Sequence, residues 1–141
     1  MAADESAYTD KDALERIQMD YGAIALKAIA KTMTMKIAQV AHEQGVPCFC
    51  ADLTVNPVLV EWNKVVAARL APFPGLGMGL LETNGHQNYR HWETMRSSHP
   101  YPEAEWAQTA DGLFNLDDDY FAKSGGILET PGHYSELVNR K

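Results

Sequence analysis

The sequence holds only two cysteines, Cys48 and Cys50, among its 141 residues. A disulfide framework needs several cysteine pairs, so these two exclude a fold that depends on disulfide bonds. They lie two positions apart in an apolar run, which places both on one face of a strand as reduced core residues. Their spacing also lacks the two-residue spacer of redox and zinc motifs. This use of cysteine favours a reducing, cytoplasmic setting.

Long apolar runs and blocks of like charge are also missing. No apolar run reaches the length that spans a membrane, and no run of five like charges occurs. The formal net charge is -7, and such a chain is repelled by nucleic acid and by anionic membrane surfaces. We therefore expect neither a nucleic acid nor a membrane among its partners. Hydrophobic residues make up 45% of the chain, which is typical of a globular protein.

Strands and helices are expected to alternate along residues 1–86. Short apolar runs bounded by turn residues predict strands, and apolar residues at helical spacing behind a capping residue predict helices. Such alternation is typical of a parallel α/β sheet with right-handed crossovers. The expected strands lie near 1–6, 23–27, 46–51 and 76–81, and the helices begin near Thr9, at Thr32 or Thr34, and at Pro57.

The stretch 22–31 has two interpretations by itself. As a helix, it would carry Lys27 and Lys31 one turn apart on its solvent face. As a strand, it sends Lys27 to the same side as two alanines, while Ile24 and Leu26 point to the other side. The predicted helices before and after it favour the strand, in which Lys27 is a candidate general base and Lys31 lies beyond the strand end.

Residues 87–141 follow a different pattern, rich in aromatic residues and poor in periodicity. We expect an ordered extension that packs on other protein, with loose final residues. The predicted organisation is therefore a parallel α/β part of four strands and three helices over 1–86, and a C-terminal extension over 87–141.

Each predicted strand delivers a polar group at its carboxyl end, where parallel α/β folds place their sites. These candidate residues are Asp4, Lys27, Asp52, Glu82 and Asn84. Carboxylates such as Asp4 suit a hard divalent cation, of which Mg²⁺ is the expected one. A lysine across from such a metal suits proton abstraction beside a carboxylate. His86 and His91 lie five positions apart, which is poor spacing for zinc.

Several motifs together resemble the enolase superfamily, in the lysine-using part of its mandelate racemase/muconate lactonizing enzyme branch. They are Ala3-Asp4-Glu5-Ser6 before a capped helix, Ile24-Ala25-Leu26-Lys27, Gly45-Val46-Pro47, a late strand ending in Glu82, and Asp111-Gly112-Leu113-Phe114 with Ser124-Gly125-Gly126-Ile127. The resemblance implies that residues 1–86 are a partial (β/α) barrel, the C-terminal half of a TIM-type barrel, in a Mg²⁺-dependent enzyme that abstracts a proton alpha to a carboxylate.

The same resemblance implies roles for single residues. Asp4 would be the last of three metal-binding carboxylates, Lys27 the acid/base, and Glu82 a second catalytic carboxylate. We further expect Asp52 and Asn84 to contact a small carboxylate substrate. The family often has Lys-x-Gly-Gly after the catalytic strand, whereas this chain has Lys31-Thr32-Met33-Thr34.

Two functions remain open at this point. The first is the C-terminal fragment of a racemase or epimerase, a cycloisomerase or an acid-sugar dehydratase, inactive alone because the family's capping domain and other metal carboxylates precede this part. The second is a non-catalytic α/β module that self-associates as a homo-oligomer through open sheet edges. A small complete α/β domain with its own ligand site is a third interpretation, and the position of Asp4 makes it the weakest.

Overall fold

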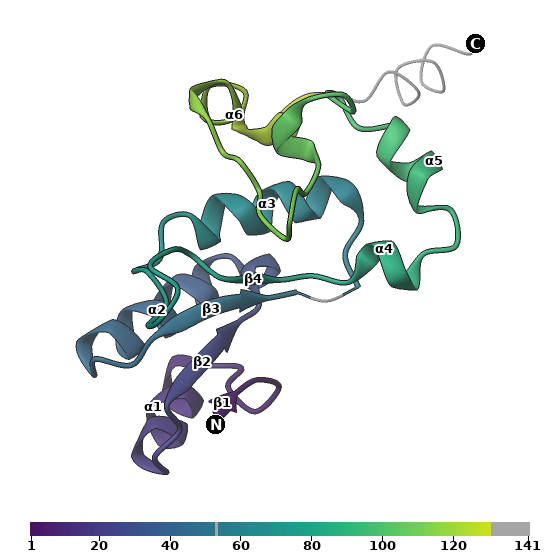
Figure 1. Cartoon of the computed structure of the whole chain (residues 1–141). Coiled ribbons are helices and arrows are strands. Elements are labelled where there is room, and N and C mark those ends of the chain that lie inside the picture. The colour runs from purple at the N-terminus through teal and green to yellow at the C-terminus, as the bar shows by residue number, and fades with distance from the viewer. Residues whose placement is uncertain (53, 131–141) are drawn as a thin grey trace. The chain divides into compact units, whose positions relative to one another are not determined.

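The computed structural model describes residues 1–52 and 54–130 (Figure 1). These residues form two compact units. Residues 1–52 and 63–83 make the first unit, and residues 54–62 and 84–130 make the second. Residues 54–62 are predicted from sequence to belong to the part spanning 1–86, whereas the structure groups them with the C-terminal part.

The first unit contains a four-stranded parallel sheet with strand order β1-β2-β3-β4. Its strands are β1 (Ala2–Ala3), β2 (Ala23–Leu26), β3 (Cys48–Ala51) and β4 (Leu81–Glu82). Spatial order follows chain order, so each connection returns the chain beside the strand it has just left. The α/β class and the parallel sheet are therefore confirmed, including the strand interpretation of the stretch before Lys27.

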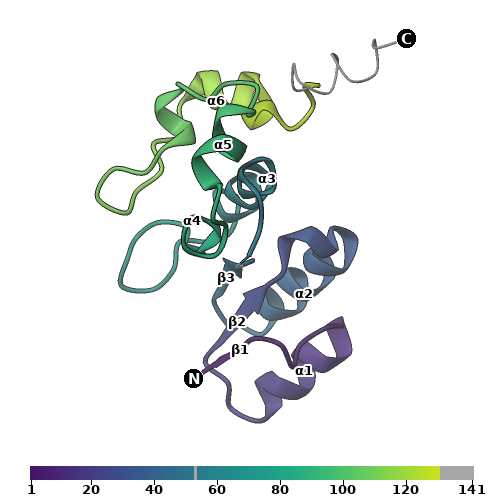
Figure 2. The same ribbon diagram turned by 90° about the vertical axis from the view of Figure 1, so that its right-hand side faces the viewer.

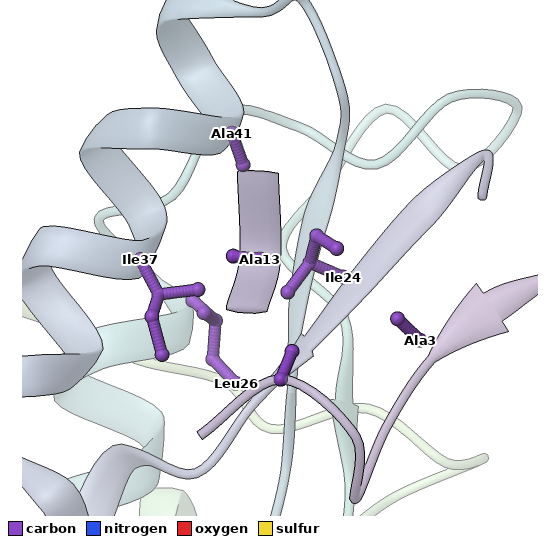
Figure 3. Close-up of a cluster of buried hydrophobic side chains, with 7 residues drawn as sticks. Ala3, Ala13, Ile24, Leu26, Ile37 and Ala41 are labelled. Atoms are coloured by element: carbon purple, nitrogen blue, oxygen red, sulfur yellow. The ribbon is translucent and has the colours of Figure 1, made fainter. Parts of the chain in front are cut away.

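Two helices cover one face of this sheet. Helix α1 (Asp10–Gln18) and helix α2 (Thr32–Glu43) lie on the same side of β1 and β2 (Figure 2). Ile24 and Leu26 of β2 meet side chains of both helices in the core, as Figure 3 shows. The buried members of this core are Ala3, Ala7, Ala13, Ile24, Leu26, Ile37 and Ala41. Ile24 and Leu26 thus lie on one side of β2, as predicted, and the structure shows that this side faces the helices.

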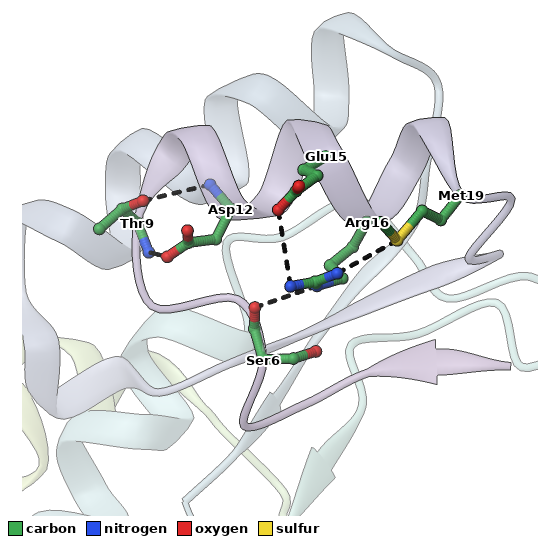
Figure 4. A network of polar contacts seen from close by, with 6 residues as sticks. All are labelled: Ser6, Thr9, Asp12, Glu15, Arg16 and Met19. Carbon is green, nitrogen blue, oxygen red and sulfur yellow. Dashed lines mark hydrogen bonds and ion pairs between the residues drawn. The ribbon is translucent and has the colours of Figure 1, made fainter.

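Helix α1 begins with a reciprocal cap. The Asp12 backbone N–H donates to Thr9 Oγ1 at 3.1 Å, and the Thr9 N–H donates to Asp12 Oδ2 at 2.9 Å (Figure 4). These bonds satisfy N–H groups that a helix start otherwise leaves without partners. The Arg16 guanidinium then ties the helix to the Ser6 carbonyl at 3.3 Å. The predicted cap at Thr9 is confirmed.

Helix α2 differs from expectation at its start. Its N-cap is Lys31, without a side-chain capping bond. Neither predicted cap, Thr32 or Thr34, performs that role, because both lie inside the helix and the Thr34 hydroxyl donates to the Lys27 carbonyl. Gly45 follows the helix in the left-handed region with φ of 68°, as expected for a glycine after a helix end.

The strand predicted over 76–81 is shorter in the structure, because only Leu81 and Glu82 pair with β3. Gly75 and Gly77 have φ of 83° and 68°, a conformation that breaks an extended strand. The Phe73 N–H donates to the Met78 carbonyl at 2.8 Å and closes a turn around these glycines. The glycines therefore form a turn before the strand instead of lining one of its faces.

The connection from β3 to β4 contains helix α3 (Pro57–Ala67), which begins in the second unit and ends in the first. Its start is the predicted one, since Asn56 Oδ1 accepts the Leu59 N–H at 3.0 Å.

The second unit consists of short helical segments around aromatic residues. These segments are α4 (Gly85–Asn88), α5 (Trp92–Ser97), the 3₁₀ turn Glu105–Ala107, α6 (Asp118–Ala122) and the 3₁₀ turn Ser124–Gly126. Trp106 and Tyr120 are buried, with ring centroids 5.3 Å apart. This packing agrees with an ordered extension up to residue 130, and the final residues expected to be loose lie outside the described part. Among the helices described, none is long and apolar enough to cross a membrane.

Candidate functional site

Lys27 is the residue directly after β2, at the carboxyl end of the sheet. Its Nζ lies 2.6 Å from Asp4 Oδ1 and donates to the Ala51 carbonyl at 2.7 Å. The Lys27 side chain is 28% exposed and that of Asp4 is 46% exposed. Lys27 therefore connects the carboxyl ends of three neighbouring strands, with one side of the ion pair open to water.

The backbone of Lys27 is held as firmly as its side chain. The Lys27 carbonyl accepts from Thr34 Oγ1 at 2.5 Å and from the Ala30 N–H at 2.9 Å. Thr34 is 1% exposed, in the first turn of α2. A buried hydroxyl needs a partner, and this carbonyl satisfies it. The helix after β2 thus fixes the strand end from which Lys27 extends.

Asp52 follows β3 and is buried, with 6% exposure. Its Oδ2 accepts the Ile29 backbone N–H at 3.1 Å. Burial raises the pKa of the Asp52 carboxyl. The Ile29 backbone N–H, the positive charge of Lys27, the Ala28 backbone and the Asn63 side chain oppose that shift. Desolvation dominates here because the charged form loses its water.

The other two predicted site residues differ in accessibility and placement. Glu82 ends β4 opposite Ala51 of β3, and it is exposed. Asn84 belongs to the second unit, where its Oδ1 accepts from Asn88 Nδ2 at 2.7 Å. The structure therefore brings Asp4, Lys27 and Asp52 together at the carboxyl ends of β1, β2 and β3. Glu82 lies at the end of the next strand, β4.

The carboxylates near Lys27 decide whether Mg²⁺ has ligands at this site, because Mg²⁺ prefers hard oxygen ligands. Asp4 offers a hard oxygen ligand with an exposed side chain. Among residues 1–52 and 54–130, no three His, Cys, Asp or Glu side chains gather closely enough to hold a metal ion. The described residues therefore offer one exposed carboxylate, Asp4, at this end of the sheet and no complete ligand set for Mg²⁺.

The cysteine thiols have the character of core groups. Cys50 is buried and Cys48 is half-buried, and both are free. Burial raises the pKa of Cys48 to about 11. Burial first, and then the nearby charges of Asp52 and Cys48, raises the pKa of Cys50 to about 12. These thiols stay protonated near neutral pH and are poor nucleophiles.

Sequence reasoning missed three groups at this site: Thr34 as a donor to Lys27, the Ala51 carbonyl, and Asn63. Thr34 was considered only as a helix cap. A backbone carbonyl carries no signal in the sequence, so the Ala51 contact required the structure. Asn63 is 1% exposed, and its position within an amphipathic helix pattern was the available signal.

Comparison with known proteins gives no assignment: no family model, curated protein or solved structure matches the chain. The function is therefore inferred from the residues at this strand edge and from the resemblance described above.

Proposed function

We propose that this chain is the C-terminal part of a Mg²⁺-dependent, enolate-forming enzyme of the mandelate racemase/muconate lactonizing enzyme type. Its reaction would be racemisation or epimerisation, cycloisomerisation or dehydration of a small carboxylate. The contact of Lys27 Nζ with Asp4 Oδ1 at 2.6 Å carries the proposal. It joins the expected acid/base to the expected metal carboxylate, on neighbouring parallel strands.

The sheet supports a barrel origin. Its order follows the chain, and α1 and α2 lie on one face of it (Figure 2). In a doubly wound sheet the strand order reverses within the sheet and helices lie on both faces. In a TIM-type barrel the helices all lie outside the sheet. A complete barrel has eight strands in about 250 residues, and this sheet has four. The remaining strands would come from a preceding part of the parent enzyme.

Lys27 is suited to move a proton at Nζ. It is fixed at both ends, through its carbonyl and through the Ala51 contact, yet keeps 28% of its side chain accessible. Fixed geometry lowers the cost of aligning a base with the proton that it abstracts. In this proposal the neutral amine takes the α-proton and becomes an ammonium. Inversion of the carbon would then need protonation from the opposite face by a second acid of the parent enzyme.

Asp4 would contribute one ligand to Mg²⁺, which when bound offsets negative charge that develops on the substrate carboxylate. Glu82 is exposed at the end of β4 and accessible for proton relay or substrate contact. Contacts of Asp52 and Asn84 with the substrate remain predictions. A cytoplasmic location also remains part of the proposal.

The test is Mg²⁺-dependent exchange of an α-proton into deuterated water, measured by NMR on a panel of small carboxylates. A polypeptide that supplies the proposed preceding strands and carboxylates is expected to catalyse exchange, and the 141-residue chain alone is expected to be inactive. Turnover by the chain alone would show that the second expectation is wrong. An upstream sequence without a Lys-x-Lys strand and two further carboxylates would contradict the proposal.

One observation favours the alternative of a self-associating module. Among the described strands, β1 and β4 are the outer ones, and each pairs on one side only. Open edges allow pairing with another chain. Each outer strand is two residues long, so such an edge presents few backbone groups. Sedimentation distinguishes the two functions, because the alternative requires a homo-oligomer at micromolar concentration.

A further inference from the structure

We propose that Asp52 is a positioning residue whose carboxylate holds the backbone that follows Lys27, and thereby the Lys27 ammonium. The catalytic meaning of this role rests on the proposed function, but the structural role does not. The distinction matters because Asp52 is expected from sequence to contact substrate, whereas the groups around its carboxylate, the Ile29 backbone N–H among them, belong to this chain.

The contacts between the ends of β2 and β3 are reciprocal. The Lys27 side chain donates to the backbone carbonyl of Ala51, at the end of β3. The Asp52 side chain, one residue later, accepts from the backbone N–H of Ile29, two residues after Lys27. Each strand end therefore binds the backbone of the other through a side chain. These two hydrogen bonds fix the segments that follow β2 and β3 relative to each other.

Because Asp52 is buried, its carboxylate needs hydrogen-bond donors from the protein in place of water. At 6% exposure, a carboxylate loses most of its hydration. Ile29, in contrast, exposes half of its residue area, at 50%. The hydrogen bond thus ties the turn Ala28–Ala30, whose first residue is buried and whose other two are exposed, to a buried group. Without this hydrogen bond, the turn and the adjoining Lys27 would sample more conformations.

The hydrogen bond from Ile29 to Asp52 affects the Lys27 ammonium because the lysine side chain is long and flexible. Lys27 has four rotatable side-chain bonds and one backbone carbonyl contact at Nζ besides the exposed Asp4. A flexible ammonium of this kind is ordered only if the backbone that carries it is ordered. Misplacement of a reacting group by about 1 Å can cost about 100-fold in rate, so Asp52 would act on catalysis through Lys27.

The test uses the 141-residue chain, the variants Asp52→Ala and Asp52→Asn, and NMR. Asparagine keeps an oxygen acceptor for the Ile29 N–H, whereas alanine removes it. We expect amide exchange at Ile29 to rise at least 10-fold in Asp52→Ala and to stay within about 3-fold in Asp52→Asn. The Lys27 Nζ protons should likewise exchange faster with water in the alanine variant only. Amides of Ala13 and Ala41 in the core serve as references.

A variant-free measurement keeps the proposal testable if Asp52→Ala fails to fold. In the unmodified chain, the Ile29 amide proton shift should follow the titration of the Asp52 carboxyl carbon. An Ile29 shift that ignores that titration would overturn the proposal. So would an alanine variant in which Ile29 and Lys27 exchange as in the parent, or an asparagine variant as impaired as alanine. These readouts need no turnover, so they decide the role of Asp52 even if the proposed enzyme activity is absent.

Discussion

At the scale of single residues, Lys27 has two partners of unequal value. Asp4 is 46% exposed, and ion pairs that accessible contribute well under about 1 kcal/mol. The Ala51 carbonyl belongs to a residue that is 1% exposed, and a charged donor to such a group is worth about 1.5–3 kcal/mol. The hydrogen bond to Ala51 should therefore outweigh the ion pair in stability.

The variants Lys27→Met and Asp4→Asn test this ranking. Lys27→Met should lower the free energy of unfolding by about 1.5–3 kcal/mol, because it removes the donor to Ala51. Asp4→Asn should lower it by less than about 1 kcal/mol, since the ion pair is open to water. Urea unfolding followed by circular dichroism measures both. Equal losses in the two variants would mean that the ion pair dominates.

Asp52 should make stability depend on pH in a defined direction. Its pKa is raised in the folded state, chiefly by burial, so folding favours the protonated form. Stability is then highest below the unfolded pKa of about 3.9 and declines as pH rises through the folded pKa. Asp52→Asn removes this decline. The difference in free energy of unfolding between the variant and the parent should shift in favour of the variant from pH 4 to pH 7, and a constant difference would contradict the burial argument.

The two thiols should resist alkylation in the native protein. With the pKa of Cys48 near 11 instead of 9.0, its thiolate fraction at pH 8 falls about 100-fold, and Cys50 falls further. Iodoacetamide labelling counted by mass spectrometry should be slow without denaturant and fast in urea. Because folding favours the thiols, stability should also fall above about pH 9. Labelling of native Cys48 at the rate of a free thiol would refute the predicted burial effect.

At the scale of elements, the start of helix α1 could be predicted from local sequence, whereas the start of helix α2 could not. The cap at Thr9 was predictable, because Thr-x-x-Asp is a local pattern whose partners are three residues apart. The start of α2 was not, because Thr34 bonds to Lys27 across a turn instead of to its own helix. The strand that contains β4 was predicted too long, because the turn conformation of Gly75 and Gly77 could not be told from the apolar run alone.

Helix capping gives a matched pair of variants. Thr9→Ala should lower the free energy of unfolding by about 1 kcal/mol, because it removes an acceptor from the first turn of α1. Thr32→Ala should cost less than about 0.5 kcal/mol, because Thr32 is exposed and makes no capping bond in α2. Urea unfolding compares the two, and a larger loss for Thr32→Ala would contradict the observed N-cap at Lys31.

At the scale of the whole molecule, the sequence pattern was sufficient for the α/β class and the parallel sheet. Alternating elements limit the topology strongly, and the period of two in β2 correctly placed Ile24 and Leu26 on one side of the strand. The grouping of 54–62 with the C-terminal part was not predictable, because it depends on packing between segments far apart in sequence. For the same reason, the backbone contacts of Lys27 and Asp52 required the structure, although both residues had been selected from sequence.

The most direct test of the central claim compares two lysines in a polypeptide that supplies the proposed preceding strands and carboxylates. Lys27→Ala should lower Mg²⁺-dependent α-proton exchange by at least about 1,000-fold, since it removes the proposed acid/base. Lys31→Ala should leave exchange within about 3-fold, because Lys31 is exposed and lies beyond the strand end. Far-ultraviolet circular dichroism confirms that each variant is folded. Exchange that survives Lys27→Ala, or that falls equally in Lys31→Ala, would contradict Lys27 as the acid/base.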